Sequence, residues 1–267
     1  MELMEDQRLR TAAVAGLFYP KAASVLRGQL AQLLAAAQPG AGECPRALVV
    51  PHAGYVYSGA AAAQAYARLI PWRAQIKRVL VLGPPHRVAV RGLATSSATA
   101  FATPLGQLPI DTSAMAVWSA VRGVAVNDPA HADEHSIEVQ IPFLQTVLGD
   151  IRLLPMLVAE SSPHRLADLL APDWQQDDTL IVVSTDLSHF LEYDQARQRD
   201  GETDATIMHL DATRIGPEQA CGYRALNGVL ALAARRRARI ERLALCNSGD
   251  TAGSRERVVG YGAYALY

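Results

Sequence analysis

Runs of apolar, β-prone residues alternate along the chain with stretches in which Ala and Leu recur at helical spacing. Continuous or alternating apolar runs predict strands, whereas recurrence every three to four residues predicts helices. We expect strands at 47–52, 78–83, 151–158, 179–185, 239–246 and 257–266. We expect helices at 22–37, 58–69, 111–122 and around 194–210 and 222–236, with short β segments broken by prolines within 92–110. The pattern predicts an α/β fold: a single layered domain with a central mixed, largely parallel sheet and helices on both faces.

Two segments need separate treatment. The stretch E-H-S-I-E-V-Q-I-P-F-L-Q-T-V-L, residues 134–148, has helical spacing, so Glu134 and His135 should lie near a helix start and Pro142 should kink the helix. The last expected strand alternates small residues with Tyr261 and Tyr264. This pattern indicates an edge strand or a strand of different direction.

The 267 residues are 50% hydrophobic with a formal net charge of −1, enough apolar material for one large core, so we expect a single domain over residues 1–267. The N-terminus, M-E-L-M-E-D-Q-R-L-R, is charged and unlike a secretion signal, and no apolar run reaches the roughly 18 residues of a membrane span. We therefore expect a cytoplasmic protein with no membrane partner. The basic cluster at 235–239 follows a predicted helix, where cations complement the helix dipole, so it does not indicate a nucleic-acid partner.

Three histidines each follow a short apolar run: His52 in A-L-V-V-P-H, His86 in V-L-V-L-G-P-P-H and His189 in L-I-V-V-S-T-D-L-S-H. In an open α/β sheet, ligands bind beyond the carboxyl ends of the strands. One such histidine alone is most simply a loop residue, but three together predict imidazoles that converge. Converging imidazoles indicate a metal site or proton transfer.

A fourth apolar run, ending in C-N-S-G-D, adds Cys246 and Asp250. Two histidines and one carboxylate are the ligand set of non-heme Fe(II) oxygen chemistry, so Asp250 is our preferred third ligand after His52 and His86. Cys246 is the alternative, and as a thiolate it would favour Cu or Zn. The simpler interpretations are a turn aspartate for Asp250 and a small buried hydrophobe for Cys246. Three cysteines without C-x-x-C spacing indicate reduced thiols.

Two further groups of residues carry possible chemistry. Asp186 precedes His189 by three residues and can orient its imidazole as a general acid or base. His135, at the start of the 134–148 helix, can contact substrate or support the metal site. For Glu138 we favour simple complementation of the helix dipole. The other three histidines, at positions 131, 164 and 209, lack such contexts and are assigned to the surface.

Taken in order, A-G-L-F-Y-P, V-V-P-H-A-G-Y-V-Y-S-G, V-L-G-P-P-H, D-E-H-S-I-E-V-Q-I-P-F-L-Q, S-T-D-L-S-H-F and N-S-G-D-T-A-G resemble the Memo family over nearly the whole chain. Its bacterial members are the B-type proteins of the AmmeMemoRadiSam system. The resemblance implies a fold similar to class III extradiol dioxygenases, in which two histidines and an acidic residue hold Fe(II) and a further histidine transfers protons. His52 and His86 match the metal histidines, and Asp186 and His189 match the later pair. A cysteine of the human relative aligns near Thr251, beside Asp250.

These observations lead to a metal-binding redox protein, a dioxygenase-like non-heme metalloenzyme of unknown substrate. We expect one divalent or redox metal, with Fe(II) favoured and Cu or Zn as alternatives, and no organic cofactor. Phe18, Tyr55 and Cys246 are expected to line the pocket. A binding or scaffold protein for a peptide or small ligand, and a metal-dependent hydrolase, are the competing functions. The family's gene neighbourhood implies a functional link to AMMECR-type and radical-SAM proteins.

Overall fold

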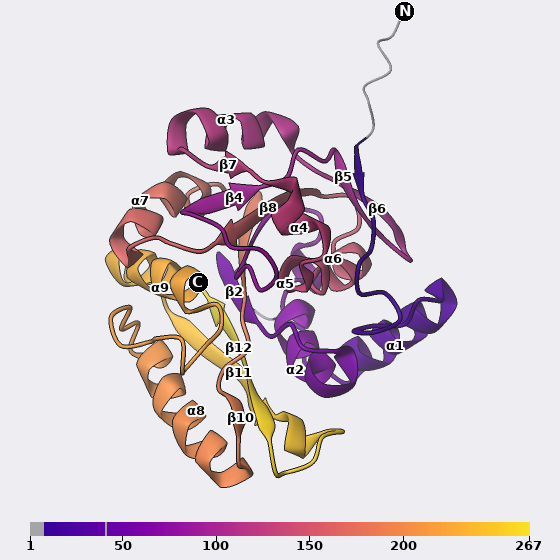
Figure 1. Ribbon diagram of the computed structural model, residues 1–267, viewed down its shortest axis with the longest axis vertical. Coiled ribbons are helices and arrows are strands. Elements are labelled where there is room, and N and C mark those ends of the chain that lie inside the picture. The colour runs from indigo at the N-terminus through magenta and orange to yellow at the C-terminus, as the bar shows by residue number, and fades with distance from the viewer. Residues whose placement is uncertain (1–7, 41) are drawn as a thin grey trace, which may run out of the picture.

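A mixed sheet runs through the centre of the protein in the computed structural model, which describes residues 8–40 and 42–267 (Figure 1). Within these residues the strands follow the order β10-β12-β2-β9-β3-β8-β4-β7, and β11 pairs with β12. Their bounds are β2 Ala47–Val50, β3 Arg78–Gly83, β4 Leu93–Thr95, β7 Ala125–Val126, β8 Arg152–Val158, β9 Thr179–Ser184, β10 His189–Leu191, β11 Ile240–Asn247 and β12 Val258–Leu266. A smaller sheet contains β1 Leu9–Arg10, β5 Ala100–Thr103 and β6 Gly106–Pro109.

The four central strands, β2, β9, β3 and β8, are parallel to one another and almost fully buried. Strands covered on both faces can be apolar throughout, which explains runs such as V-L-V-L-G in β3. Because the strands are parallel, the segments that follow β2, β3 and β9 leave the sheet at one edge. The expected α/β class is confirmed.

The two strands that flank the central four, β4 and β12, run in the opposite direction. β4 is antiparallel to β8, and β12 is antiparallel to β2, β10 and β11. The prediction of a differently directed last strand is therefore correct. The alternative of an edge strand is wrong, because β12 lies between β2 on one side and β10 and β11 on the other.

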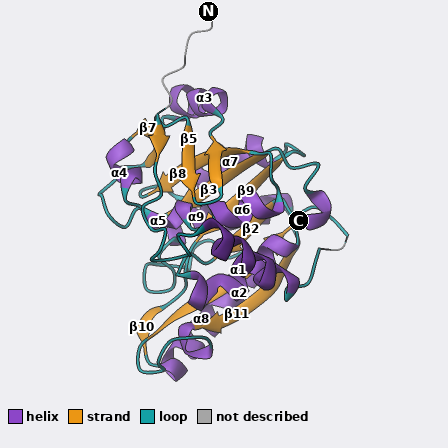
Figure 2. Ribbon diagram, turned by 90° about the vertical axis from the view of Figure 1, so that its right-hand side faces the viewer, coloured by secondary structure: helices purple, strands orange, loops and turns teal. Residues whose placement is uncertain are grey.

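Helices cover both faces of the sheet. α7 (Pro163–Trp174) and α9 (Tyr223–Arg236) pack on one face, whereas α1 (Ala23–Ala35), α2 (Tyr55–Ala67) and α6 (Ile141–Val147) lie on the other (Figures 1 and 2). α8 (Tyr193–Met208) packs on β11 and β12. The remaining helical segments are α3 Thr112–Arg122, α4 Asp128–Ala132, α5 His135–Glu138 and the 3-10 turns Ile70–Trp72 and Ser248–Asp250. None of the helices in the described ranges is long and apolar enough to span a membrane.

The structure departs from the predicted helices most strongly at residues 134–148 and at α7. The expected helix over 134–148 is divided into α5 and α6, because Pro142 has no N–H to continue a helix and instead sits in the first turn of α6. Helix α7 was not predicted. Its sequence does contain a start signal, because the Ser162 hydroxyl accepts from the Arg165 N–H and Pro163 opens the helix.

Candidate metal centre

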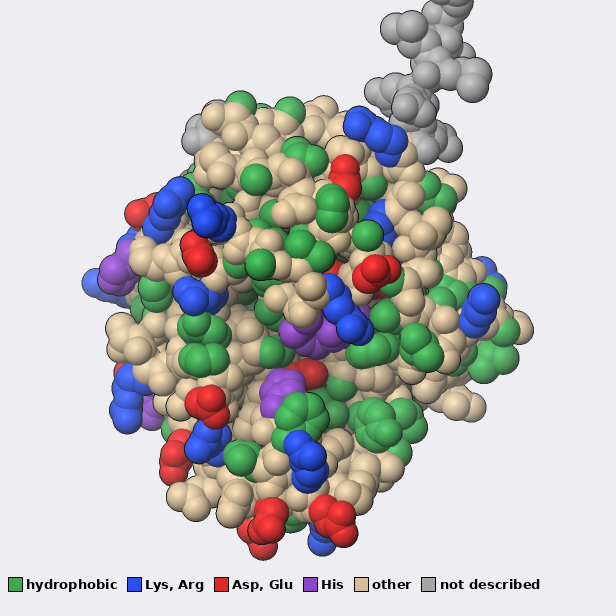
Figure 3. Space-filling view, in the orientation of Figure 1, with side chains coloured by type: hydrophobic (Ala, Val, Ile, Leu, Met, Phe, Trp, Pro, Cys, Tyr) green, Lys and Arg blue, Asp and Glu red, His purple; other side chains and the backbone are tan. Residues whose placement is uncertain are grey.

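Three histidines from separate segments meet at the edge where the parallel strands end. His52 follows β2, His86 follows β3 and His135 begins α5, and one ligand atom from each lies within 4.8 Å of the others. The ring centroid of His52 lies 5.2 Å from that of His86 and 5.3 Å from that of His135. Figure 3 shows histidine side chains gathered in a hollow near the middle of this face. The prediction that His52 and His86 converge is confirmed, and His135 is the third member.

His52 is buried, with 1% of its surface exposed. Its Nδ1 lies 2.9 Å from the Ser184 hydroxyl oxygen at the end of β9, so Nε2 is the atom that it can offer to a ligand. Burial, and then the neighbouring imidazoles of His86 and His135, lower the pKa of His52 well below its usual value. The ring is therefore neutral at physiological pH, as metal binding requires.

Glu134 holds His86 at two points. One carboxylate oxygen accepts from the His86 backbone N–H, and the other lies 2.9 Å from Nδ1 of the same ring. That second oxygen also accepts from the Ser136 N–H, so Glu134 caps α5. Burial opposes ionisation of Glu134, but the hydrogen bonds and charge of His86 outweigh it and lower the pKa to about 2. An ionised carboxylate here leaves Nε2 of His86 free for a ligand.

His135 is held mainly by stacking. Its ring lies 4.7 Å from the His86 ring, nearly parallel to it, and 4.7 Å from the ring of Phe18. Its Nδ1 is 3.3 Å from Glu134 Oε1 but is buried without a well-aligned hydrogen bond. Burial, opposed by the charge of Glu134, lowers the pKa of His135 to about 4.

This donor set fits a metal ion. The rings of His52 and His135 are kept neutral, and the Nδ1 atoms of His52 and His86 face protein oxygens, the arrangement in which outer partners orient metal-binding histidines. The unpartnered Nδ1 of His135 marks the third imidazole as less tightly fixed than the other two. Imidazole nitrogens suit Zn, Cu and Fe alike, so the residues define a site without selecting one metal.

Asp186 does not reach His189 in the described structure; it contacts His52 instead. Its Oδ1 accepts from the His52 backbone N–H at 2.7 Å, and its Oδ2 is 4.0 Å from His52 Nε2. Burial raises the pKa of Asp186 to about 7, against the opposing hydrogen bonds from the backbone of His52 and Ala53. The expectation that Asp186 orients His189 therefore has no hydrogen bond to support it, because the carboxylate is used by the turn after β2.

His189 is the first residue of β10 and lies near the centre without joining the three-histidine group. Burial lowers its pKa, and the charge of His86 lowers it further, so the two rings are close enough to interact electrostatically. The next residue, Phe190, has a positive φ of 61° and is 62% exposed. His189 is partly buried and is not a member of the three-histidine group.

Cys221, which the sequence reasoning did not select, also belongs to this region. Its sulfur lies 3.4 Å from His52 Nε2 and accepts from the Asp186 N–H at 3.3 Å. Burial, and then the charge of Asp186, raise the pKa of this thiol to about 12. The sequence signal that could have found Cys221 was its position directly before the helix predicted at 222–236, next to Gly222. Gly222 packs against Thr185, where a Cβ atom would lie 2.7 Å from the Thr185 Cβ.

The two candidates for the third ligand lie elsewhere. Asp250 is exposed, and its carboxylate accepts from the Tyr193 hydroxyl at 2.5 Å and from the Asn247 N–H at 3.0 Å, which caps the 3-10 turn at the end of β11. Cys246 lines a small cleft of about 180 Å³ with Asp200 and Asp250, and burial raises its pKa to about 11. Neither joins the three-histidine group, so the geometry favours the turn-aspartate interpretation of Asp250.

Phe18 and Tyr55, both expected to line the pocket, have different positions. Phe18 contacts the His135 ring as described above, at the border of the centre. Tyr55 is 3% exposed, packs on Phe143 and donates to the Val139 carbonyl at 2.7 Å. Tyr55 is therefore a core residue beneath the site.

The structure corrects two further interpretations, the dipole role of Glu138 and the surface position of His131. Glu138 is fully buried and accepts hydrogen bonds from Arg10, Tyr19 and the backbone N–H groups of Ala13 and Val14. It thus anchors the N-terminal segment that carries Phe18, instead of only complementing a helix dipole. His131 is 2% exposed, with its Nε2 3.2 Å from the Ala94 carbonyl. The histidines at 164 and 209 are exposed, as expected.

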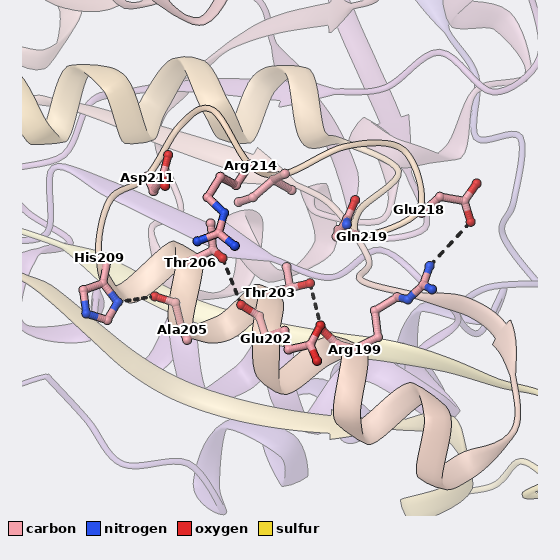
Figure 4. Close-up of a pocket in the computed structure, with 11 residues that line it drawn as sticks. Arg199, Glu202, Thr203, Ala205, Thr206, His209, Asp211, Arg214, Glu218 and Gln219 are labelled. Atoms are coloured by element: carbon pink, nitrogen blue, oxygen red, sulfur yellow. Dashed lines mark hydrogen bonds and ion pairs between the residues drawn. The ribbon is translucent and has the colours of Figure 1, made fainter.

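A cavity of about 880 Å³ lies away from the histidine centre, between α8 and the segment that leads to α9 (Figure 4). Its charged and polar side chains largely contact one another or their own helix. Arg199 pairs with Glu218 at 3.6 Å, and the Thr203 and Thr206 hydroxyls donate to carbonyls one turn earlier. None of the three converging histidines lines this cavity, so we place the candidate site at the histidines although the cavity is large.

Fold and site together define an α/β protein with a candidate three-histidine metal centre at the carboxyl ends of parallel strands. The sequence model of the family described as "Memo-like protein" matches residues 10–265, so the chain belongs to this family. A MEMO1 family protein of Aquifex aeolicus is 32% identical, with 95% of this chain and 97% of the relative covered. MEMO1 family proteins of Methanopyrus kandleri and Thermotoga maritima are each 31% identical, covering 95% and 97% of this chain and 97% and 99% of the relatives. The family resemblance read from the motifs is confirmed.

Proposed function

We propose that this Memo family protein is a metal-dependent enzyme whose metal is held by His52, His86 and His135, with a dioxygenase-like oxidoreductase as its leading form. The observation that carries the proposal is the convergence of three imidazoles within 4.8 Å, two of them with Nδ1 turned toward a protein oxygen. Polar order of this kind is costly to build into a core unless a bound ion uses it.

A metal held by these three histidines would supply Lewis acidity and, if redox active, electrons for oxygen chemistry. The residues of the chain supply the surroundings. Glu134 fixes His86, and Phe18 covers one side of the His135 ring. His189, with a lowered pKa, is neutral near pH 7 and is placed to accept a proton from a substrate at the rim. The resemblance to extradiol dioxygenases favours Fe(II).

A metal-dependent hydrolase is the second candidate. It is favoured by the third ligand, because three histidines without a carboxylate are a ligand set of catalytic zinc sites that keep an open position. Both candidates need the same three residues, so they differ in the metal and in the use of oxygen.

The test is metal analysis of anaerobically purified protein, followed by oxygen uptake with candidate phenols and by hydrolysis of activated esters. Wild type and the control His209→Ala, which removes an exposed imidazole, should hold one metal ion per chain, and His86→Ala should not. Iron with substrate-dependent oxygen uptake supports the oxidoreductase. Zinc with ester hydrolysis supports the hydrolase. Failure of the wild type to bind iron, copper or zinc on reconstitution refutes both.

A further inference from the structure

A chain of buried hydrogen bonds lies behind His52, and it begins at Gln140. The side-chain Nε2 of Gln140 is 3.0 Å from the Pro51 carbonyl and 2.8 Å from the Ser184 hydroxyl oxygen. A carbonyl oxygen can only accept, so the amide nitrogen must face Pro51. Its Oε1 then accepts from the Tyr66 hydroxyl at 2.8 Å. These partners leave one orientation of the amide group, and Gln140 is 1% exposed.

Ser184 transmits this order to His52. Its hydroxyl carries one proton and two lone pairs, and it has three polar neighbours. The Ser136 carbonyl, at 2.5 Å, can only accept and therefore takes the proton. Gln140 Nε2 donates to one lone pair. The second lone pair faces Nδ1 of His52 at 2.9 Å, so that nitrogen must carry the ring proton.

We propose that Ser184 and Gln140 are positioning residues that hold His52 in the tautomer protonated on Nδ1, with the Nε2 lone pair directed to the metal. The inference rests on the proposed metal site for its purpose. The tautomer itself follows from the hydrogen bonds alone and can be measured without metal. The Cys221 sulfur at 3.4 Å from Nε2 agrees with it, because a thiol is a weak donor to a free lone pair.

Ser184 is fully buried at the end of β9, so its hydroxyl cannot exchange these partners for water. Without its hydroxyl, Nδ1 of His52 would lose its acceptor, and the neutral ring could place the proton on Nε2. The proton would then occupy the position needed by the metal. Loss of an outer partner of this kind costs about 10–100-fold in metal affinity.

The experiment combines two measurements on wild type, Ser184→Ala, Ser184→Thr and the control Ser58→Ala. Ser58 is equally buried and donates to the Ala53 carbonyl at 2.9 Å, but its hydroxyl contacts no histidine. The ring ¹⁵N shifts of His52 in metal-free protein report the tautomer, and competition with a chelator gives the Kd for Zn²⁺. We expect protonation on Nδ1 in wild type and control, a shift toward Nε2 with a Kd about 10–100-fold weaker in Ser184→Ala, and recovery of both in Ser184→Thr.

Protonation on Nε2 in the wild-type protein overturns the inference. This measurement needs no substitution, so it does not depend on whether a variant folds. An unchanged tautomer and Kd in Ser184→Ala also overturn it. If wild-type protein shows the Nδ1 tautomer but binds no metal, the positioning network stands and the proposed metal-dependent function fails. The two proposals are thereby separated.

Discussion

The edge with the three histidines and the turn after β11 both place ligand-type residues just beyond an apolar strand, but their side chains are in opposite situations. His52 and His86 turn Nδ1 toward protein oxygens and keep a second nitrogen free. Asp250 is exposed, and both its carboxylate oxygens accept local hydrogen bonds. A ligand-type residue at a strand end therefore indicates a site only when its neighbours leave a donor atom available to its counterparts.

Strand order alone does not explain this difference, because β3 and β11 each lie two strands from β2. β2, β9 and β3 are adjacent and parallel, so their following segments meet. β12 lies between β2 and β11, so the end of β11 is also two strands from β2, roughly 10 Å away at ordinary strand spacing and as far as β3 is across β9. The local contacts separate the two regions, because both carboxylate oxygens of Asp250 are taken up by Tyr193 and Asn247 and Asp250 does not join the three-histidine group.

The largest effect is expected when one side chain is removed from each region and the metal contents of the two variants are compared. His86→Ala should lose stoichiometric metal, since it removes a ligand. Its metal affinity should fall further than the loss of about 10–100-fold that follows removal of an outer partner. Asp250→Ala should retain the metal content of wild type. Metal analysis after dialysis checks both, with circular dichroism to confirm folding. Loss of metal in Asp250→Ala and retention in His86→Ala would reverse the assignment.

A second test asks whether a buried histidine outside the centre, His131, stays unprotonated in the folded protein as pH falls. Burial, opposed by the Ala94 carbonyl, lowers the pKa of His131 to about 4. Its unfolded pKa is near 6.5, so below that pH the unfolded chain takes up a proton that the folded chain does not, and stability falls as pH drops from 6.5 toward 4. The full loss is about 3 kcal/mol.

Denaturant titrations of metal-free protein between pH 7 and pH 4 measure this loss as a slope. His131→Gln should be less stable at pH 7 but should show a flatter dependence on pH than wild type. The exposed His209→Gln variant should keep the wild-type slope. A slope unchanged by His131→Gln would show that His131 takes up its proton in the folded state.

Glu134 provides a third test, within the histidine edge itself. Glu134→Gln removes the charge and one of the acceptors that serve His86 and the start of α5, so Zn²⁺ affinity should fall about 10–100-fold. The matched control is Asp133→Asn, an exposed neighbouring carboxylate, which should leave the Kd unchanged. Equal effects of the two substitutions on Kd would argue against a specific role for Glu134.

The smallest effect is expected in the C-terminal turn. Asp250→Ala removes the cap of the 3-10 turn after β11 and should lower the free energy of unfolding by about 1 kcal/mol. Thermal unfolding of the metal-free protein measures this change. A destabilisation several times larger would mean that the turn supports more of the fold than its exposed contacts indicate.

The fold was predictable because buried parallel strands have a recognisable composition. The run V-L-V-L-G gave β3 at its observed bounds, and the alternation around it gave the layered class. The missed helix α7 follows a Ser-Pro start signal within a loop, and the expected helix over 134–148 was divided by the backbone restriction at Pro142. Helix prediction from local sequence fails where a helix signal and a proline or loop signal occur within a few residues.

The site was predictable only in part, because spacing along the chain does not give strand order. His52 and His86 follow parallel strands of one sheet that are separated only by β9, so the strand-end argument located both. His135 and Cys221 begin or precede helices, where no periodic signal marks a ligand. Asp250 was favoured by its residue type, its place after an apolar run and the family alignment, none of which shows its hydrogen bonds. The burial of Glu138 depends on Arg10 and Tyr19, far away in the sequence, and local charge patterns cannot show it.

Strand β9 lies between β2 and β3, although it follows both in the chain. During synthesis, a nascent chain that ends before residue 179 has already emerged with all three histidines, but it lacks the strand that holds β2 and β3 in register. Such long-range insertion is slow compared with local helix formation. If the proposed site holds a metal, it should form only after β9 has been inserted, so products truncated before residue 179 should not bind the ion.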